Sequence, residues 1–430
     1  MRLLLSGGTV YRDKSFSKLD ISVSDGKIVS ISPFISPKGF DLVFNLKSLF
    51  VFPGLVDVHV HLREPGFSYK ETISSATLAA AKSGYTALCA MPNLNPAPDS
   101  PENLEKELDI IKKDALVKVI PYGTITKNRA GTELSDMEAL TPYVAGFSDD
   151  GSGVSDSGLM EKAMRRAKKL GKIIAAHCED KSLLSGGYIH AGKYAAEHSL
   201  AGISSESEWA MVKRDIALAE KTGCLYHVCH VSTKESVSII RDAKKRGARV
   251  TCETAPHYLL LCDEDLRDDG RYKMNPPLRS RADMEALREG LADGTIDMIA
   301  TDHAPHSADE KNKGLSGSAM GVTGIECAFP VLYAGLVKKG VISLEKLVSL
   351  MSVSPAEVFG FESGLDIGKN ADLSVFSLGE TYKIDSESFA SMGKSTPFDG
   401  TEACGRCFLT LLGGKTVWAD EKNIESEKPF

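Results

Sequence analysis

Long apolar runs and an excess of positive charge are both missing from this chain of 430 residues. No stretch reaches the roughly 20 apolar residues that a membrane-spanning helix requires, so we expect no membrane segment. The first residues are soon broken by Gly7 and Gly8 and are too short for a secretory signal peptide, which we do not expect either. The net charge of −7, without a long basic run, argues against a surface that binds nucleic acid.

The sequence also lacks the cysteine pattern of a disulfide framework. Its nine cysteines are odd in number and scattered, and most lie in apolar segments that resemble strands. This distribution is typical of free thiols in a reducing compartment, so we expect a cytoplasmic protein. Cys404 and Cys407 have the spacing of half a zinc knuckle, but no second pair accompanies them in the sequence, and we interpret the spacing as chance.

The middle of the chain alternates short apolar segments with amphipathic stretches, and no internal repeat or low-complexity segment interrupts the pattern. Helices are expected between the strands, for example over residues 74–83, 159–170 and 233–245. Strand–helix alternation repeated about eight times is typical of a TIM-like (β/α)8 barrel, which we predict over residues 51–365. The predicted strands are 49–58, 86–91, 118–123, 144–147, 173–176, 225–228, 249–252 and 298–300.

Both ends of the chain are rich in short predicted strands instead, and residues 24–27 have the composition of a hairpin turn. We therefore predict an α/β protein in which residues 1–50 and 366–430 together form a small β-sandwich domain beside the barrel. The strand-like segments of the two ends include 3–11, 20–31, 372–376 and 407–412.

Histidines and aspartates follow directly after many of the predicted strands. His59 and His61 lie two residues apart, so both imidazoles would point to the same side of a strand. Active sites of such barrels lie at the carboxyl ends of the strands, which would bring these groups together. Two histidines at one point suit a transition metal, with zinc as the leading candidate. The other strand-end candidates are Asn93, Asp149, Asp150, His177, His227, His230, His257, Asp302 and His303.

These candidate ligands exceed the needs of a single zinc ion. A catalytic zinc usually takes three protein ligands and a water, whereas two metals about 3.5–4 Å apart would use four histidines and two aspartates, with one carboxylate as a bridge. His227 and His230 cannot both face one side of an ideal strand, and we favour His230 as the ligand. We expect His257 and His303 to pack or to support their loops.

A set of motifs extends these candidates along nearly the whole chain. The motifs occupy residues 59–66, 67–72, 91–93, 148–151, 176–180, 227–233, 274–279 and 301–306. In this order they are similar to the motifs of the class I dihydroorotases in the amidohydrolase superfamily, and the split β domain at the two termini matches that family as well.

This resemblance implies a two-metal hydrolase with a role for each matching residue. The implied ligands of two zinc ions are His59, His61, Asp150, His177, His230 and Asp302, with Asp150 as the bridge and Asp302 also as the catalytic acid/base. The implied substrate-binding residues are Arg63, Asn93 and His306 for a carboxylate, Asn275 for a pyrimidine ring, and the backbone near Met320 and Gly321.

The implied reaction is the reversible hydrolysis of dihydroorotate to N-carbamoyl-L-aspartate, a step of pyrimidine (UMP) biosynthesis. Dihydropyrimidinases, allantoinases and some dihydroorotases resemble each other closely here but bridge their metals with a carboxylated lysine. This sequence has Asp149 and Asp150 at that point, and the spacing to His177 favours Asp150 while leaving Asp149 open. The lysines within residues 168–172 precede a predicted strand and belong on the opposite side of the barrel.

Arg63 supports the same substrate independently. Dihydroorotate carries a ring carboxylate, which a guanidinium binds well, whereas dihydrouracil and allantoin do not. A site for neutral rings would leave this charge unpaired. An allantoinase or hydantoinase is the alternative enzyme. A metal-free scaffold for a transcarbamoylase is the non-enzymatic alternative, which the complete ligand set argues against. We expect a homo-oligomer that acts on a small molecule, and an association with aspartate carbamoyltransferase stays open.

Overall fold

Eight parallel strands occupy the middle of the chain in the computed structural model, which describes residues 1–427. One sheet has the order β6-β7-β8, and a second has the order β15-β14-β13-β10-β9. Isolated parallel bridges join Gly123 to Phe147 and Val60 to His303, so the edges of the two sheets meet at both ends. Each predicted strand therefore has an observed counterpart. The strands are β6 (Leu55–Val60), β7 (Tyr85–Ala90), β8 (Lys118–Pro121), β9 (Gly146–Phe147), β10 (Ile173–Ala176), β13 (Leu225–Val228), β14 (Val250–Thr254) and β15 (Met298–Ile299).

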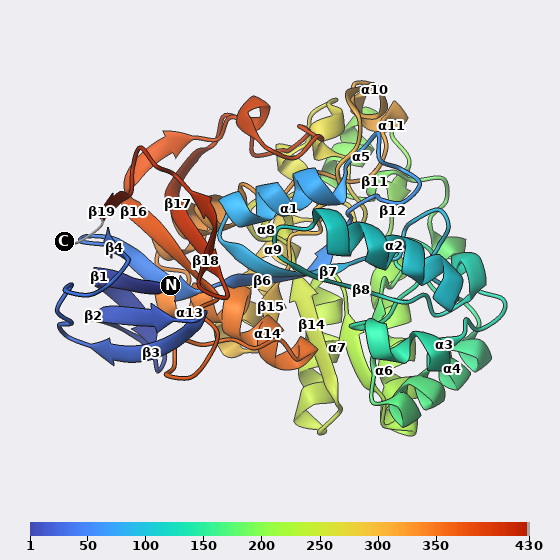
Figure 1. The fold of residues 1–430 in the computed structure, drawn as a ribbon. Helices are drawn as coiled ribbons and strands as arrows, with labels where there is room; N and C mark the ends of the chain where they lie inside the picture. The colour runs from blue at the N-terminus through green and yellow to red at the C-terminus, as the bar shows by residue number, and fades with distance from the viewer. Residues whose placement is uncertain (428–430) are drawn as a thin grey trace.

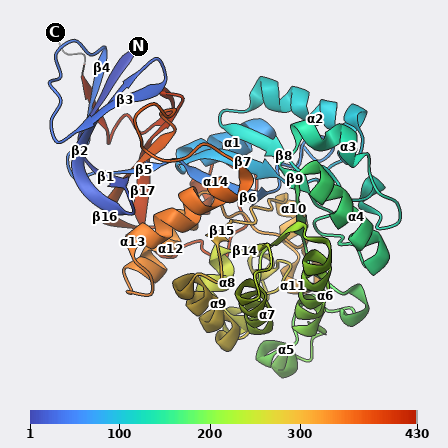
Figure 2. The ribbon, with the colours of Figure 1, turned by 90° about the horizontal axis from the view of Figure 1, so that it is seen from below.

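Helices lie between these strands in the sequence and surround them in space (Figure 2). The longer helices are α1 (Ile73–Lys82), α2 (Pro101–Asp114), α4 (Ser157–Leu170), α6 (Glu206–Thr222), α7 (Lys234–Lys245) and α9 (Arg281–Asp293). The shorter ones are α3 (Met137–Leu140), α5 (Lys193–His198), α8 (Pro256–Leu260), α10 (Ala308–Lys311), α11 (Gly314–Gly317), α12 (Ala328–Leu332), α13 (Leu344–Val348) and α14 (Ser354–Phe359). A further two-stranded sheet pairs β11 (Ile189–His190) with β12 (Gly202–Ile203).

Local sequence explains why a helix such as α4 begins, ends and packs where it does. The side chain of Asp156 accepts a hydrogen bond from the backbone N–H of Leu159, which caps the first turn. The helix ends at Gly171, which has a φ of +68°, a conformation that glycine adopts without strain. The buried face repeats at helical spacing, with Met160, Ala163, Met164 and Ala167 turned toward the strands.

The two ends of the chain meet in one nine-stranded sheet, at the left of Figure 1. Its main path has the order β18-β17-β16-β5-β1-β2-β3, and β4 pairs with both β1 and β19. Leu5, Val51, Val375 and Leu409, from both ends of the sequence, are buried in the same apolar cluster. The strands are β1 (Arg2–Arg12), β2 (Ser15–Ser24), β3 (Lys27–Ser32), β4 (Leu42–Asn45), β5 (Phe50–Pro53), β16 (Leu373–Lys383), β17 (Glu402–Leu412), β18 (Lys415–Ala419) and β19 (Glu425–Glu427).

The apolar run over residues 49–58, predicted as a single strand, is divided between the two regions. Its first part, β5, pairs with β1 and β16 in the terminal sheet, whereas β6 pairs with β7. Gly54 separates them in a crowded place, because a Cβ atom there would lie 2.1 Å from the hydroxyl of Thr86. The sequence pattern did not indicate this division, since both parts are equally apolar.

The connection between β16 and β17 leaves the terminal sheet and packs against loops at the strand ends. The backbone N–H of Thr323 donates to the carbonyl of Ser395 at 2.8 Å, and the Thr323 hydroxyl donates to that of Gly393 at 2.9 Å. The hydroxyl of Ser391 donates to the carboxylate of Glu71. Residues near the C-terminus thus support the same loops that follow β6 and β15.

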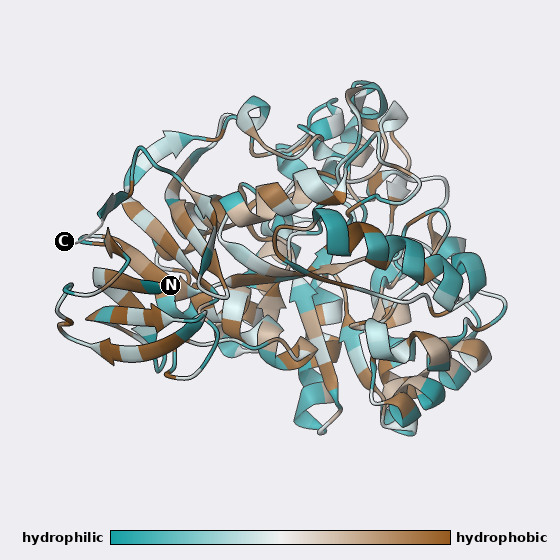
Figure 3. Ribbon diagram, viewed as in Figure 1, coloured by the Kyte–Doolittle hydropathy of each residue, from teal (hydrophilic) through white to brown (hydrophobic). Residues whose placement is uncertain are grey.

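Apolar residues concentrate in the strands, while outward helices such as α2 are largely hydrophilic (Figure 3). Within residues 1–427, no helix combines the length and the apolar character needed to cross a bilayer. All nine cysteines are buried and unpaired, as predicted for free thiols. Cys404 and Cys407 are among them and lie within β17.

Candidate metal centre

Four imidazoles and two carboxylates converge where the parallel strands end. The ring centroids of His59 and His61 lie 5.4 Å apart, and the ring of His230 lies 5.0 Å from His59 and 4.8 Å from His177. All six side chains are buried; His59 lies near the end of β6, and the other five follow β6, β9, β10, β13 and β15. The six residues are His59, His61, Asp150, His177, His230 and Asp302.

The carboxylate of Asp150 lies at the centre of this cluster. Its Oδ1 is 3.5 Å from His59 Nε2, 3.4 Å from His230 Nε2 and 3.8 Å from His177 Nδ1. Its Oδ2 is 3.6 Å from His61 Nε2. Burial opposes ionisation of Asp150, but the surrounding imidazoles, above all His59, hold its pKa well below the usual range. The ionised carboxylate of Asp150 therefore faces all four histidines of the cluster.

The spacing of these atoms fits shared metal ions better than direct hydrogen bonds. Ligands bound to one zinc at about 2.0–2.2 Å lie roughly 3.3–3.6 Å apart in a tetrahedral arrangement. Three of the four nitrogen–oxygen distances around Asp150 are of this size, and the fourth, to His177 Nδ1, is 3.8 Å. His59 Nε2 and Asp150 Oδ1 are buried and have no hydrogen-bond partner among residues 1–427. Buried polar atoms rarely stay unpaired, and a metal ion bound by these groups would satisfy both.

Asp302 adds a second carboxylate on the side of His59 and His61. Its Oδ1 lies 3.2 Å from His61 Nε2 and 3.6 Å from His59 Nε2. Burial opposes ionisation here too, but contact with His61 and the nearby charge of His59 lower the pKa of Asp302. Asp302 also borders the cavity beside the cluster, where it can reach a bound molecule.

Asp149, the open alternative to Asp150, points elsewhere. Its Oδ1 accepts the backbone N–H groups of Ile125 at 2.8 Å and Thr126 at 3.1 Å, and its Oδ2 accepts the hydroxyl of Thr126. These contacts use the carboxylate to hold the loop after β8. Of the two aspartates, Asp150 alone faces the histidines. Lys168 and Lys172, expected on the opposite side, donate to the carbonyls of Thr222 and Val144, away from the cluster.

Glu253, a residue that sequence reasoning missed, holds His59 in position. Its Oε1 lies 2.6 Å from His59 Nδ1, which leaves His59 Nε2 free to face Asp150 and Asp302. Its Oε2 lies 3.0 Å from His227 Nε2, and His227 Nδ1 lies 2.8 Å from the hydroxyl of Thr251. His227 is therefore part of the support and not of the cluster. The only sign of this role in the sequence was the position of Glu253 directly after the predicted strand over residues 249–252.

His257 and His303 also lie outside the cluster. His257 is buried against the ring of Tyr258, and burial lowers its pKa to about 4. His303 accepts the backbone N–H of Gly324 at 3.3 Å, and its own carbonyl accepts the N–H of His61 at 2.8 Å. Both positions agree with the packing and supporting roles expected from the sequence.

The predicted substrate-binding residues line one cavity of about 250 Å³ beside the cluster. Arg63 is buried, donates through Nε to the carbonyl of Pro305 at 3.1 Å, and lies 3.3 Å from His306. Burial and the charges of Arg63 and Lys70 lower the pKa of His306 to about 3, so its imidazole is neutral. The remaining lining residues named by the sequence are Asn93, Asn275, Met320 and Gly321.

Two asparagines leave acceptors available in this cavity. Asn93 donates to the carbonyl of Asp150 at 2.9 Å, and Asn275 donates to Glu179 at 2.9 Å. The Oδ1 atoms of both asparagines are buried and lack a hydrogen-bond partner among the described residues. A ring that carries N–H groups could supply these missing donors.

Three residues of the site adopt backbone conformations that are unusual for residues other than glycine. Arg63 has a φ of +63°, His230 of +35° and Asp302 of +47°. Such conformations cost of order 1–3 kcal/mol each and are found most often at functional sites. Three of the eleven described non-glycine residues with positive φ thus belong to the cluster and the cavity.

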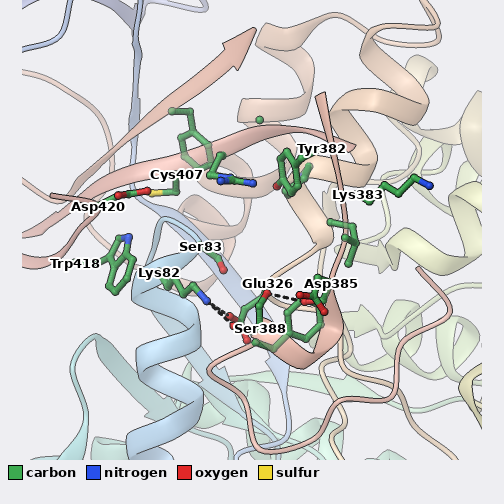
Figure 4. A pocket seen from close by; sticks show the side chains of 16 residues that line it. Lys82, Ser83, Glu326, Tyr382, Lys383, Asp385, Ser388, Cys407, Trp418 and Asp420 are labelled. Carbon is green, nitrogen blue, oxygen red and sulfur yellow. Dashed lines mark hydrogen bonds and ion pairs between the residues drawn. The ribbon is translucent and has the colours of Figure 1, made fainter. Parts of the chain in front are cut away.

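A second cavity, of about 350 Å³, lies between α1 and strands β16–β18 (Figure 4). Lys82 points toward Glu326 and donates to the carbonyl of Ser388, and the guanidinium of Arg406 stacks on Tyr382. None of the residues predicted for the site lines this cavity. The predicted site residues therefore line the smaller cavity beside the histidines and not this one.

Comparisons of sequence relate the chain to dihydroorotases. A family model described as "Dihydro-orotase-like" matches residues 48–236. A dihydroorotase of Bacillus cytotoxicus is 49% identical over 425 residues, which cover 98% of this chain and 99% of that protein. A dihydroorotase of Bacillus cereus is 50% identical over 408 residues, which cover 94% of this chain and 95% of the relative.

Comparisons of structure identify more distant neighbours. The L-hydantoinase (dihydropyrimidinase) of Arthrobacter aurescens superposes with a TM-score of 0.88 at 26% identity, covering 97% of this chain and 96% of that one. The D-hydantoinase (dihydropyrimidinase) of Thermus sp. superposes with a TM-score of 0.85 at 26% identity, covering 99% and 97%. The mixed α/β architecture is thus shared with cyclic amidohydrolases.

Proposed function

The chain belongs to the dihydroorotase family, and we propose that it catalyses the reversible hydrolysis of dihydroorotate to N-carbamoyl-L-aspartate in pyrimidine biosynthesis. The observation that carries this proposal is Arg63, a buried guanidinium in the same cavity as the histidine cluster. A ring carboxylate would pair with it, whereas the neutral rings of hydantoin or dihydrouracil would leave it unpaired. The relatives of about 50% identity favour the same substrate over those of the hydantoinases.

We propose that the cluster holds two zinc ions bridged by Asp150. His59, His61 and Asp302 would bind the first, and His177 and His230 the second. Histidine nitrogens with carboxylate oxygens are a typical donor set for zinc. When bound, zinc would lower the pKa of water to about 7 and polarise the carbonyl that is attacked.

The residues of the chain then bind the substrate and move its proton. Arg63, Asn93 and His306 would hold the ring carboxylate, while Asn275 and the backbone near Met320 and Gly321 would orient the ring. Asp302 would accept the proton of the attacking water and deliver it to the departing ring nitrogen. The amide bond breaks, the second carboxylate of carbamoyl-aspartate forms, and one proton is released overall.

We also infer how the sheets are completed. The two bridges between the parallel sheets support a closed (β/α)8 barrel over residues 51–365. The shared sheet of the two termini supports a small β-sandwich over 1–50 and 366–430, although β5 crosses the first of these boundaries. A cytoplasmic location, a homo-oligomeric state and an association with aspartate carbamoyltransferase stay predictions.

A metal-replete assay with four substrates tests the proposed function. Dihydroorotate and carbamoyl-aspartate should interconvert, while allantoin and dihydrouracil should react at least about 100-fold more slowly in kcat/KM, because a buried charge discriminates strongly. Ring opening releases a proton, so the equilibrium should move toward carbamoyl-aspartate by about tenfold per pH unit near neutrality. Faster turnover of dihydrouracil than of dihydroorotate would reject the proposal in favour of a hydantoinase.

A further inference from the structure

Lys311, at the end of α10, reaches into the protein and contacts three backbone carbonyls. Its Nζ donates to the carbonyls of Lys273 at 3.0 Å, Ala319 at 2.8 Å and Gly321 at 2.7 Å. The side chain is buried, with 4% exposed. An ammonium group has three N–H donors, so these three acceptors use all of them.

The three carbonyls belong to two segments that form walls of the substrate cavity. Lys273 lies two residues before Asn275, and Gly321 follows Met320, so both segments carry residues that line the cavity. The segments also touch directly, since the N–H of Gly321 donates to the carbonyl of Lys273 at 3.1 Å. Lys311 therefore fastens the wall that carries Asn275 to the wall that carries Met320 and Gly321.

The backbone at Gly321 leaves little freedom for a shift. Its φ is +132°, and a Cβ atom there would lie 2.7 Å from the carbonyl of Ala304 and 3.1 Å from His306 Nε2. The same His306 nitrogen donates to the carbonyl of Met320 at 2.9 Å. A displacement of this wall would reach the imidazole proposed to bind the carboxylate.

Burying the ammonium group of a lysine without a carboxylate partner costs free energy. No carboxylate forms an ion pair with Lys311 within residues 1–427. Burial and the charge of Lys273 lower the pKa of Lys311 to about 7, so the cation is disfavoured at this place. The three backbone carbonyls are the only hydrogen-bond partners of Lys311 Nζ among the described residues, so its role follows from what they position.

We propose that Lys311 is a positioning residue for substrate binding, which fixes the backbone near Met320 and Gly321 relative to Asn275. This inference rests on the proposed function, because it assumes that the ring of dihydroorotate lies between these two walls. Lys311 acts through the backbone and touches neither the substrate nor the metal ligands. Its removal should therefore change KM and leave the chemical step largely intact.

The test compares Lys311→Met with Lys313→Met, a matched control at an exposed lysine two residues along. In metal-replete protein, Lys311→Met should raise KM for dihydroorotate by about tenfold with kcat within about threefold, since charged hydrogen bonds are lost from the wall. Metal content should equal that of the wild type, and Lys313→Met should behave as the wild type. General loosening of the fold would instead lower kcat and metal content together, and that result overturns the proposal.

Ser318→Ala provides a milder second variant. The hydroxyl of Ser318 donates to the carbonyl of Lys311 at 2.7 Å, so its loss loosens the same wall while the ammonium stays. KM should rise by about threefold, and this result decides the matter if Lys311→Met does not fold. An unchanged KM in the folded Lys311→Met protein, beside an active wild type, overturns the positioning role alone. A wild type that does not turn over dihydroorotate overturns the proposed function and this inference with it.

Discussion

At the scale of single residues, the site depends on carboxylates that stay ionised in a buried place. Burial by itself raises the pKa of Asp150, Glu253 and Asp302, yet the pKa of each is lowered, because imidazoles lie against all three. The histidines are in turn oriented by these carboxylates, as His59 is by Glu253. These carboxylates and histidines thus fix each other's orientation, which favours tight and specific metal binding.

Replacing Asp302 tests the proton transfer. We expect Asp302→Ala to lower kcat by at least about 1,000-fold, because the variant lacks the carboxylate that would take the proton from water and give it to the ring nitrogen. Metal analysis should find most of the zinc retained, since five other ligands stay in place. Asp309→Ala, at an exposed aspartate nearby, is the control and should be fully active. An active Asp302→Ala protein would be incompatible with the assigned role.

Replacing Arg63 tests the carboxylate site. Arg63→Met keeps much of the side-chain volume and removes the guanidinium, so KM for dihydroorotate should rise by about 10- to 100-fold. Arg12→Met is the control. The side chain of Arg12 is partly exposed on the terminal sheet, and its loss should leave the kinetics unchanged. Steady-state kinetics on both variants give the comparison. A KM for Arg63→Met equal to that of the wild type would contradict the proposal that Arg63 binds the ring carboxylate.

The residues that sequence reasoning found and those it missed differ in the contacts that define their roles. His59 lies near the end of β6 and the other ligands follow apolar strands, and the rule that barrel strands end at the active site places them together. Glu253 directly follows the predicted strand over 249–252, but its contact with His59 depends on how the neighbouring strands are packed. Lys311 lies in a polar segment, where a lysine is ordinarily solvated. No local pattern distinguishes these two from ordinary residues.

At the scale of elements, strand–helix alternation predicts the order of β6 to β15, but not which sheet each strand joins. The run over residues 49–58 is continuous in composition, and only the pairing of β5 with β16 assigns its first half to the terminal sheet. The return of the β16–β17 connection to Thr323 is likewise a contact distant in sequence. Periodicity describes local burial and does not specify such pairings.

The division at Gly54 makes a prediction about stability. In Gly54→Ala the new Cβ would overlap the side chain of Thr86, and the free energy of unfolding should fall by about 1–3 kcal/mol. Denaturant unfolding measures this difference. Gly379→Ala is the control, because a Cβ there meets nothing within 4 Å and the φ of Gly379 is ordinary. Equal stability of the two variants would mean that β5 and β6 can separate slightly at no cost.

At the scale of the whole molecule, the six proposed ligands follow strands that belong to two separate sheets. β6 lies in the three-stranded sheet, whereas β9, β10, β13 and β15 lie in the five-stranded one. An ion held by His59, His61 and Asp302 would therefore connect the two sheets beside the bridge from Val60 to His303. Metal binding and global stability should be coupled for this reason.

Metal removal tests this coupling. An ion that binds only the folded protein adds about 2.7 kcal/mol when its concentration is 100 times its Kd, so a chelator should lower Tm and added zinc should restore it. The effect should weaken below about pH 6, where protons compete for the histidines. A chelator saturated with zinc beforehand is the reagent control, and His198→Ala, at an exposed histidine, is the matched control for His177→Ala. His177→Ala should respond less to the chelator than the wild type, while His198→Ala should respond equally. A wild-type Tm that ignores both chelator and zinc would contradict the proposal that metal ions join the two sheets.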